Sequence, residues 1–584
     1  MIQPFKLPIE YLKKKEKVNE NIITDLELLK TNSFIPFKKE ETFKKEENKT
    51  ENEIPLLNSI FKPKTKIANI ILKKQSEFYT YDKVYLKETQ KLIKNFKNEN
   101  SETQEIEKTK CYDDFYDLWN QLTNDEGFID KYYYVDIDYF KFLNNSAPFL
   151  KILSIYNLLS PILSLALPIF LLLVPFFMLK FSGLKITISS YIEQLKIIFA
   201  KHAIGNIFNI FKNISWEKRV YGIISILFYL FSIYQNTIVC YRFYHNFYQI
   251  HKDIESLKKY LHFTFINITN LEKQICKLSV YDSFLNDIQM NKIHLENIYQ
   301  RCNKISEFKI SNFARKINEI GDIMNLYYEL HDNANIKKVI QYSFQLNGYI
   351  ENINCLNDLH RTNQINSFKF GKKINFNNIY LPNTKSKKDI CKNDISLNKN
   401  IIITGPNASG KTTILKSVLF NILFSQMFGM GFYEKATLNL YNKIHCYLNI
   451  PDTSGRDSLF QAEARRCKEI IDSIKNNKKH FCIFDELFSG TNPIEANASS
   501  IGFIKYLQTF PNTNFILTTH LHSICNTLEN QIKNCSMETN NKDDLSLEFT
   551  YKIKNGISNT LGGLKVLYEL NFPKYVIEHA EREM

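Results

Sequence analysis

A glycine-rich stretch followed by a lysine and a threonine is the part of this sequence with the clearest chemistry. The stretch "NIIITGPNASGKTTILKSVLF" contains the spacing Gly405-x-x-x-x-Gly410-Lys411-Thr412. A β-branched strand precedes it and a helical run follows it, which is the order that a phosphate-binding loop requires. The glycines let backbone N–H groups face phosphate oxygens, and the dipole of the following helix adds to the attraction.

The same stretch supplies side chains for a nucleotide and its metal ion. We expect Lys411 to reach the β- and γ-phosphates and the Thr412 hydroxyl to ligate Mg²⁺. The predicted ATP-binding loop consists of Gly405, Pro406, Asn407, Ala408, Ser409, Gly410, Lys411, Thr412 and Thr413.

Two further polar segments end apolar strands later in the chain. In "HFCIFDELFSGTNP", we expect Asp485 to hold Mg²⁺ and Glu486 to be the general base that activates the attacking water. The next strand, "NFILTTH", ends in His520, where it can contact the γ-phosphate or that water. Paired acids are common in loops, and a lone histidine is more often a surface or core residue. Their order after the loop favours Lys411, Glu486 and His520 as catalytic residues.

These motifs resemble the MutS family of DNA mismatch-repair ATPases. The loop is similar to the family's T-G-P-N-x-x-G-K-[ST] pattern, with its preceding N-D element at Asn393-Asp394. "FDELFSGTNPIEAN" resembles the D-E-x-x-x-G-T-[ST] segment, and "LTTHLHSI" the T-H switch. "SLFQAEARR" resembles the S-x-F-x-x-E segment that completes a partner subunit's nucleotide site. The resemblance covers residues 366–584, is weak over 245–365 and is absent before them.

The resemblance implies an ATPase that uses ATP and Mg²⁺, acts on double-stranded DNA and works as a homodimer with ATP between its subunits. Ser458 would donate to the γ-phosphate in trans, and Ser458 and Glu463 would lie at the dimer boundary. Two departures concern recognition. Ile390 stands where an adenine-stacking aromatic residue is often found, and we recognise no mismatch-reading domain with a Phe-x-Glu wedge. The first departure does not threaten ATP binding, and the second weighs against specific mismatch recognition.

Two long apolar runs contain no charged residue. They extend over residues 152–179 and 220–241, which is 28 and 22 residues. About 20 apolar residues suffice for a helix to cross a bilayer. A buried core helix is the alternative, but runs of this length without charge favour a two-helix membrane hairpin, with lipid contacting residues 152–241. Prolines that neighbouring helices can accommodate in a membrane interrupt the first run at Pro161, Pro168 and Pro175.

The segment between the two runs, residues 180–219, is basic, with seven Lys and Arg against two Glu. Its apolar clusters and lysines alternate at roughly helical spacing, which is typical of a helix on a membrane surface. The positive charge favours the cytoplasmic side for this segment. Two full crossings from a cytoplasmic ATPase domain would place it on the opposite side. Either the charge bias is overridden, or the hairpin enters and leaves without crossing fully.

Composition divides the chain and limits its environment. The net charge of +14 agrees with a polyanionic partner, and equally with a solvated Lys-rich surface. The 11 cysteines include no C-x-x-C pair, which favours a reducing compartment. The N-terminus has no apolar segment typical of a signal peptide. We predict a flexible charged arm, a small helical domain, the membrane hairpin, a helical lever or core domain and an ATPase domain, over residues 1–66, 67–147, 148–242, 243–365 and 366–584.

The predicted fold class is α+β and multi-domain, with an ABC-type P-loop α/β ATPase, a central all-α lever or bundle and a two-helix membrane hairpin. The expected function is that of a MutS-type DNA-binding ATPase at a membrane, with its ATPase domain facing the cytoplasm. One alternative is a membrane-associated ABC-type ATPase for membrane remodelling or transport-linked work. Two spans are few for a transporter, and an L-S-G-G-Q element is missing before the acidic strand. Another alternative, a nucleotide-binding scaffold that scarcely hydrolyses, is disfavoured by the intact catalytic set.

Overall fold

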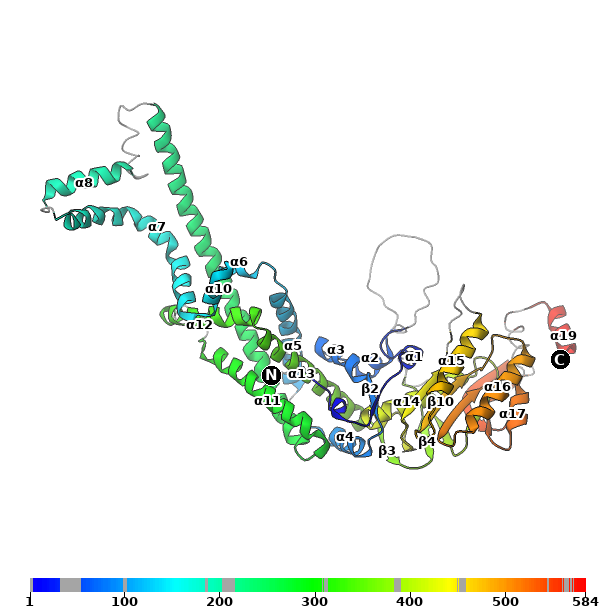
Figure 1. The fold of residues 1–584 in the computed structure, drawn as a ribbon. Helices are drawn as coiled ribbons and strands as arrows, with labels where there is room; N and C mark the ends of the chain where they lie inside the picture. The colour runs from blue at the N-terminus through cyan, green and yellow to red at the C-terminus, as the bar shows by residue number, and fades with distance from the viewer. Residues whose placement is uncertain are drawn as a thin grey trace. The chain divides into compact units, whose positions relative to one another are not determined.

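The computed structural model divides the chain into two compact units (Figure 1). The first comprises Lys110–Phe265 and Asn291–Gln341, and the second comprises Pro4–Thr109, Ile266–Met290 and Tyr342–Met584. Its mixture of helices and sheets confirms the predicted α+β class. The described residues are 4–31, 54–97, 102–183, 187–201, 216–306, 308, 313–382, 390–448, 450, 458–543, 546–558, 560, 567, 570 and 572–583.

The described part of the first unit is helical and has an aromatic core. Phe115 stacks on Tyr260 with ring centroids 4.6 Å apart, and Phe128 stacks on His331 at 3.9 Å. Four of the helices, α5, α10, α11 and α13, also contribute residues to the second unit. The helices are α5 (Glu102–Thr123), α6 (Phe128–Lys131), η3 (Asp138–Asn145), α7 (Ala147–Phe181), α8 (Ile188–Lys201), α10 (Trp216–Ile275), α11 (Asp282–Lys304), α12 (Phe313–Asp332) and α13 (Ala334–Arg361).

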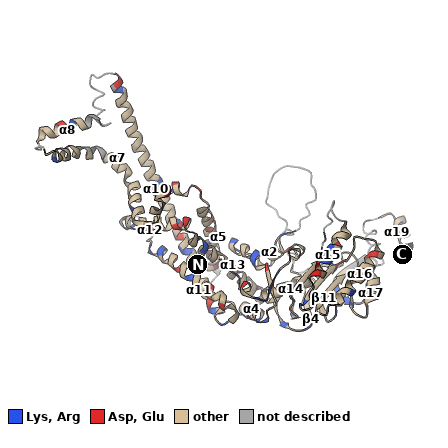
Figure 2. Cartoon of the chain, viewed as in Figure 1, with Lys and Arg blue, Asp and Glu red and all other residues tan. Residues whose placement is uncertain are grey.

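Helices α7 and α10 contain the two charge-free runs. Helix α7 continues through all three prolines and bends along its length (Figure 1), because proline removes a backbone donor and clashes with the preceding turn. By length and composition, α7 over Ala147–Ala166 and α10 over Arg219–Ile275 could each cross a membrane. Figure 2 shows how few charged residues this part of the chain carries. Residues 184–186 and 202–215 of the basic segment lie outside the described residues.

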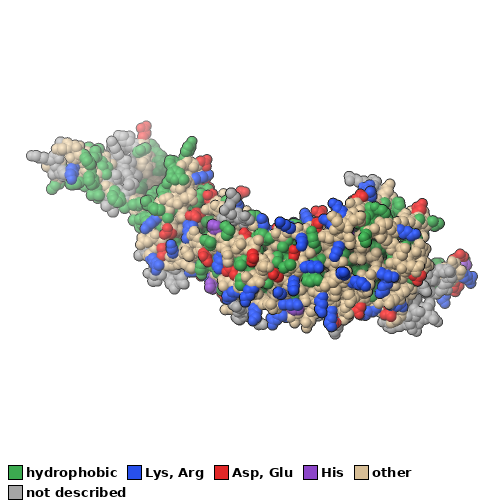
Figure 3. Space-filling view, turned by 60° about the horizontal axis from the view of Figure 1, so that its bottom comes forward, with side chains coloured by type: hydrophobic (Ala, Val, Ile, Leu, Met, Phe, Trp, Pro, Cys, Tyr) green, Lys and Arg blue, Asp and Glu red, His purple; other side chains and the backbone are tan. Residues whose placement is uncertain are grey.

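Polar groups join α7 to α10 on the inside of this pair. Tyr229 Oη donates to the Ser164 carbonyl oxygen at 3.1 Å, and Asn236 Nδ2 donates to Ser164 Oγ. Cys240 Sγ donates to the Leu158 carbonyl oxygen at 3.3 Å. This arrangement, polar inside and apolar outside, is the reverse of a water-soluble helix pair. Exposed apolar side chains on the outside include Ile162, Phe170, Phe177, Ile223, Leu227, Phe228 and Phe231 (Figure 3).

The described N-terminal segments pack into the second unit, which differs from the flexible arm expected over residues 1–66. Phe5 and Ile22 are almost fully buried, and the Phe61 ring lies 5.5 Å from that of Phe428. Residues 32–53 of the expected arm lie outside the described residues. The N-terminal elements are η1 (Pro8–Tyr11), β1 (Lys15–Lys17), α1 (Glu20–Asp25), α2 (Leu56–Phe61), α3 (Lys66–Gln75), β2 (Phe78–Thr80) and α4 (Lys83–Asn95).

The expected helical domain over residues 67–147 is also divided differently. Its residues up to Thr109 belong to the second unit, and those from Lys110 belong to the first. The cause is the buried face of α4, where Gln90 Nε2 donates to the carbonyl oxygens of Phe368 and Gly429, at 3.2 and 2.9 Å. Composition along the chain does not reveal such contacts, because the partner groups are more than 270 residues away.

Two sheets form the C-terminal part of the second unit. The larger has the order β13-β12-β6-β11-β10-β9, parallel except for β13, and the smaller has the order β5-β4-β8-β3-β7. Carboxyl ends of parallel strands meet at one edge, so residues that follow β6, β10 and β11 come together. The larger sheet contains β6 (Ile401–Thr404), β9 (Lys443–Tyr447), β10 (His480–Asp485), β11 (Thr513–Thr518), β12 (Lys533–Asp543) and β13 (Ser546–Asn555). The smaller contains β3 (Asn366–Phe370), β4 (Ile374–Ile379), β5 (Asn393–Leu397), β7 (Met430–Gly431) and β8 (Lys435–Leu438).

Helices cover the larger sheet on both faces. Helix α14 (Lys411–Phe428) packs on β10 and β11, whereas Phe484, Phe515 and Leu517 point to the other face and form a core with the remaining helices. Those helices are α15 (Leu459–Ser473), α16 (Pro493–Gln508) and α17 (His522–Leu528), and η4 (Ser279–Tyr281) and α19 (Lys574–Arg582) complete the described elements.

We predict that Gln426→Leu lowers the free energy of unfolding of the full chain by about 2–4 kcal/mol, because it leaves three buried backbone groups without partners. Gln426 donates to the carbonyl oxygens of Thr80 and Tyr441, and it accepts from the Tyr441 N–H. Urea unfolding followed by circular dichroism measures the loss. The control is Gln508→Leu, since the Gln508 side chain makes no hydrogen bond to a described residue. Equal losses in both variants would contradict the prediction.

Candidate active site

The predicted phosphate-binding loop connects β6 to α14, in the order that the sequence indicates. Gly410 has φ +94°, and a Cβ there would lie 3.1 Å from the Tyr551 ring, so this position requires glycine for two reasons. Ser409 Oγ donates to the Pro406 carbonyl oxygen at 2.8 Å and stabilises the turn. Ala408, which precedes Ser409 in the loop, also has a positive φ, of 60°. These backbone angles and the Ser409 hydrogen bond fix the turn of the loop that leads into the N-terminus of α14.

Lys411 is buried beneath this loop. Its Nζ donates to the carbonyl oxygens of Gly405 and Pro406, at 2.9 and 3.2 Å, and lies 3.6 Å from the Glu486 carboxylate. Burial lowers the pKa of Lys411, and the neighbouring carboxylates oppose that shift. Two carbonyl oxygens and the Glu486 carboxylate therefore hold the Lys411 ammonium group close to the loop. The phosphate oxygens of a bound nucleotide could replace these acceptors.

Asp485 and Thr412 lie together at the end of β10. Thr412 Oγ1 donates to Asp485 Oδ2 at 2.7 Å, and Thr518 Oγ1 donates to the other carboxylate oxygen. These contacts bring together the two predicted metal ligands. In the described part of the chain, no group of three or more His, Cys, Asp and Glu gathers. A metal ion here would therefore depend on these two oxygens, on phosphate and on water, which is how Mg²⁺ is usually held.

Glu486 and His520 form the other half of the predicted catalytic set. His520 Nε2 lies 2.8 Å from Glu486 Oε1 and 2.9 Å from Lys411 Nζ, so one ring nitrogen faces both partners. It can donate to the carboxylate or accept from the ammonium group, but not both at once. The hydrogen bond from His520, helped by the charge of Lys411, lowers the pKa of Glu486 although burial opposes this. Glu486 is consequently ionised at neutral pH, as a general base must be.

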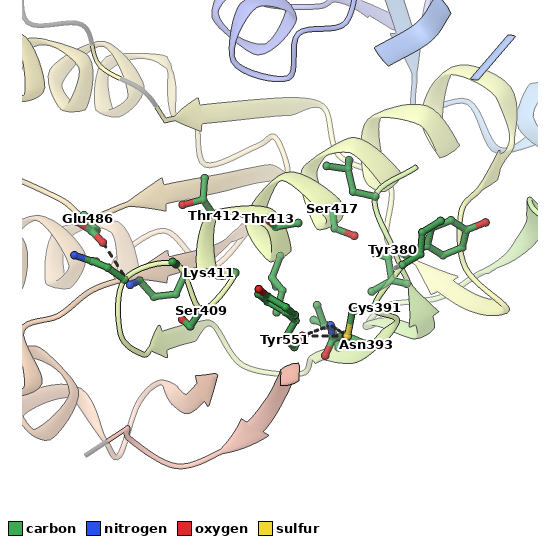
Figure 4. Close-up of a pocket in the computed structure, with 18 residues that line it drawn as sticks. Tyr380, Cys391, Asn393, Ser409, Lys411, Thr412, Thr413, Ser417, Glu486 and Tyr551 are labelled. Carbon is green, nitrogen blue, oxygen red and sulfur yellow. Dashed lines mark hydrogen bonds and ion pairs between the residues drawn. The ribbon is translucent and has the colours of Figure 1, made fainter. Parts of the chain in front are cut away.

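A cavity of about 540 Å³ extends from this cluster to the smaller sheet (Figure 4). One end is lined by the loop, from Asn407 to Thr413, and by Glu486. The other end is lined mainly by apolar side chains, and Ile390 is one of them. The volume and the two-ended chemistry suit a ligand with an anionic and an apolar part. The residues at the second end are Ile379, Tyr380, Leu381, Ile390, Cys391 and Ile395, with the polar Asn393 and Ser417 beside them.

Tyr551 and Tyr380 line the cavity and were not found from the sequence. Figure 4 shows Tyr551 between the loop and the apolar end. Asn393 holds its strand there, because its side chain donates to the Tyr551 carbonyl oxygen at 3.0 Å and accepts from the Ile553 N–H at 2.8 Å. Burial raises the pKa of Tyr380 to about 12. Neither tyrosine belongs to a local motif. The one signal in the sequence is the N-D element at Asn393-Asp394, because Asn393 binds β13.

Ser458 and Glu463 are placed differently from each other. Ser458 is exposed at the N-terminus of α15, where its Oγ accepts from the Gln461 N–H at 3.3 Å. Glu463 is 2% exposed and binds the loop after β10 of its own chain. It accepts from the N–H groups of Ser489 and Gly490, both at 3.1 Å. Ser458 is therefore open to a partner, whereas the Glu463 carboxylate fixes a loop within this subunit.

Comparison with known proteins identifies this part of the chain. The family model described as MutS domain V matches residues 401–584. The C-terminal part of this chain belongs to the MutS family. That assignment confirms the resemblance seen in the sequence.

Curated relatives are similar over the same region only. The DNA mismatch repair protein MSH3 of Scheffersomyces stipitis is 30% identical over 213 residues, which is 34% of this chain and 20% of the relative. Endonuclease MutS2 of Clostridium novyi is 28% identical over 33% of this chain and 25% of its own length. The DNA mismatch repair protein MutS of Listeria welshimeri is 28% identical over 32% and 22%. The matched region thus spans a quarter or less of each of these MutS-family relatives.

We predict that Glu463→Ala speeds amide hydrogen exchange at Ser489 and Gly490 by about tenfold, because their donors lose a buried acceptor. Peptide-level exchange detected by mass spectrometry measures this without any nucleotide. Glu469→Ala, on the exposed face of the same helix, is the matched control. Unchanged exchange in the Glu463 variant would show that this carboxylate does not hold the loop.

Proposed function

We propose that this chain is a membrane-tethered, DNA-binding ATPase of the MutS type that works as a dimer with ATP between its subunits. The observation that carries the proposal is the cluster at the carboxyl edge of the larger sheet. There Lys411, Glu486 and His520 lie within hydrogen-bond or ion-pair distance of one another. Thr412 donates to Asp485, the residue before Glu486. Membership of the C-terminal part in the MutS family supports the same function.

ATP fits the two ends of the cavity. The loop N–H groups, the helix N-terminus and Lys411 favour the phosphates. The apolar end, closed on one side by Tyr380 and bordered by Tyr551, favours the base, so the missing aromatic at Ile390 is no obstacle. Thr412 and Asp485 would hold Mg²⁺, which when bound neutralises phosphate charge.

Glu486 is the proposed base for water attack. Its carboxylate is ionised, and His520 with a proton on Nε2 donates to it and fixes its orientation. Lys411 also neutralises Glu486, which weakens its basicity. If phosphate oxygens of bound ATP replace Glu486 as the partner of the Lys411 ammonium group, the Glu486 carboxylate becomes free to accept a proton from water. His520 then has the carboxylate as its remaining partner.

Ser458 supports a role across a dimer interface. As the cap of α15, its Oγ serves only as an acceptor toward the described residues, so its O–H can donate to a further partner. Its exposure at a helix N-terminus also suits an anion from a second subunit. Glu463 contributes indirectly in this proposal, because it fixes the Ser489–Gly490 loop next to the start of α15.

The hairpin of α7 and α10 is the proposed membrane tether, with the ATPase domain on the cytoplasmic side. Its support is the combination of exposed apolar side chains with polar contacts between the helices. In lipid, backbone and side-chain polar groups must find partners inside the protein. Ser164, Tyr229 and Asn236 do so.

A row of lysines on α4 supports contact with a nucleic-acid backbone. Lys83, Lys87 and Lys91 recur at every fourth residue and are exposed on one face, and no described acidic side chain pairs with them. Figure 3 shows many Lys and Arg side chains on the face in view, interspersed with other residues. Such contacts recognise phosphates and not base sequence.

A second candidate is a membrane-associated ABC-type ATPase that remodels membranes or assists transport without acting on DNA. The extent of exposed apolar surface on α7 and α10 favours it. Both candidates require hydrolysis, and they differ in the need for DNA.

We predict that Glu486→Gln lowers ATP turnover at least about 100-fold and traps an ATP-bound dimer, because the variant keeps the shape of the side chain but cannot accept the proton. Phosphate release and light scattering measure the two effects. Glu469→Gln, on the exposed face of α15, is the control. Undiminished hydrolysis in the Glu486 variant would rule out its role as base.

We predict that the purified full chain binds duplex DNA with an affinity that falls linearly with salt on logarithmic axes. Changing Lys83, Lys87 and Lys91 together to Gln should reduce the slope by about 2–3, since each lost phosphate contact contributes about 0.9. Fluorescence anisotropy with matched and mismatched duplexes measures both. Absence of binding to either duplex at low salt would contradict the DNA role and favour the second candidate.

A further inference from the structure

A short loop before α7 exposes an unusual number of large apolar side chains. In the segment from Ile137 to Phe142, Ile137 is 61% exposed, Tyr139 89%, Phe140 50% and Phe142 66%. Single exposed apolar residues are ordinary, but four within six residues form a patch that marks an interaction surface.

The protein holds this loop in shape. Asn144 is fully buried, and its side chain accepts from the Val135 N–H and donates to the Val135 carbonyl oxygen, both at 2.9 Å. These two bonds close the loop at its base. Lys141 pairs with Asp138 at 2.8 Å and with Asp136 at 3.7 Å, which ties these charged side chains together and leaves one net negative charge beside the aromatic side chains.

The loop lies beside the beginning of the charge-free hairpin. Helix α7 starts at Ala147, two residues after η3 ends. The stem before the loop contacts α10, since the Tyr133 ring lies 6.1 Å from that of Phe243 and Asn246 Nδ2 donates to the Lys131 carbonyl oxygen at 2.5 Å.

Exposed tyrosines of α10 flank Phe243, the residue that contacts the stem of this loop. Tyr241 and Tyr244, on either side of Phe243, are 69% and 48% exposed. We propose that the loop 137–142, together with Tyr241 and Tyr244, forms an aromatic belt that inserts at the interface between lipid headgroups and acyl chains. This inference rests on the proposed membrane hairpin and adds a second, separate membrane contact.

A second aromatic group lies at the far end of the apolar run of α10. Trp216 and Tyr221 are 77% and 68% exposed. Tyr221 and Tyr241 are 20 residues apart, which is about 30 Å along a helix. The hydrocarbon core of a bilayer is also about 30 Å thick. Aromatic residues at both ends of an apolar span of that length are typical of a membrane-crossing helix, where their rings lie at the headgroup level.

The bilayer is favoured over a protein partner by continuity. The loop leads directly into α7, and its stem contacts α10. The charged groups beside it, Asp136, Asp138, Lys141 and the exposed Arg242, suit the headgroup level, where charged and aromatic side chains anchor a span. Large exposed rings with a polar edge, such as Tyr139, suit an interface that is apolar on one side and wet on the other. The same residues therefore set the depth at which the first unit meets the membrane.

Fluorescence quenching by brominated lipids tests the belt in the full chain. The background protein carries Trp216→Phe, which leaves the buried Trp119 as a constant signal. Four reporters are then compared, namely Tyr139→Trp and Phe142→Trp in the loop, Phe228→Trp in the hairpin and Tyr506→Trp on α16 as the exposed control. Phosphatidylcholine vesicles carry bromine either near the glycerol end or near the methyl end of the acyl chains.

We expect bromine near the glycerol end to reduce the loop reporter signal by about twofold, and bromine near the methyl end to have less effect. Phe228→Trp should show the opposite order, and Tyr506→Trp no quenching. Quenching of the hairpin reporter alone would overturn the belt and leave the tether in place. No quenching at any reporter would overturn the tether as well. Loop reporters that are blue-shifted before vesicles are added, and unquenched afterwards, would show that a second protein surface covers the loop and would overturn the proposal.

Discussion

The burial of α14 on all sides is the constraint on which the second unit depends. Every residue from Ser417 to Phe428 is buried, although the segment includes Asn421, Ser425 and Gln426. Each of these three polar side chains has hydrogen-bond partners, whereas the buried Ser417 hydroxyl has none among the described residues. Most of the polar groups that the helix encloses are therefore satisfied. The sheet covers one side, and the N-terminal helices α2 and α4 cover its C-terminal end. The phosphate-binding loop is therefore attached to an element that cannot move independently of the unit.

The hairpin of the first unit pairs its polar groups in the opposite arrangement, with polar groups inside and apolar side chains outside. Where α14 satisfies polar groups within a core that water never reaches, α7 and α10 satisfy them between two helices whose outer surface is apolar. Ser164 illustrates the difference, since its hydroxyl and carbonyl groups both find partners on α10. Water would satisfy such groups on a soluble surface, and their pairing is of greatest value in a medium without hydrogen-bonding solvent. The polarity of the hairpin and the aromatic loop at its base thus support the same proposal, a membrane contact.

Local motifs predicted which segments meet at the candidate site, because the motifs lie in short segments with fixed neighbours. The spacing around Lys411 and the strand ends at Asp485 and His520 each specify a position in a parallel sheet, and the structure brings them together. The N-terminal arm could not be predicted in the same way. Phe61 is buried by Phe428, a residue 367 positions later, and nothing in its own segment signals that partner. Tyr551 was missed for the same reason, and Glu463 was placed at a boundary although its acceptors are used within the subunit.

Strand order explains why His520 lies between the lysine and the base. The order β6-β11-β10 places one strand between the loop that carries Lys411 and the strand that ends at Asp485. Neighbouring strands are about 4.8 Å apart, so these two ends are separated by about 10 Å. A residue just beyond β11 spans that separation. The parallel register pairs Asp485 with Thr518, and the Glu486 N–H donates to the Thr518 carbonyl oxygen at 3.1 Å. A shift of one residue in that register would turn these side chains to the opposite face of the sheet, and the contacts of His520 would be lost with it.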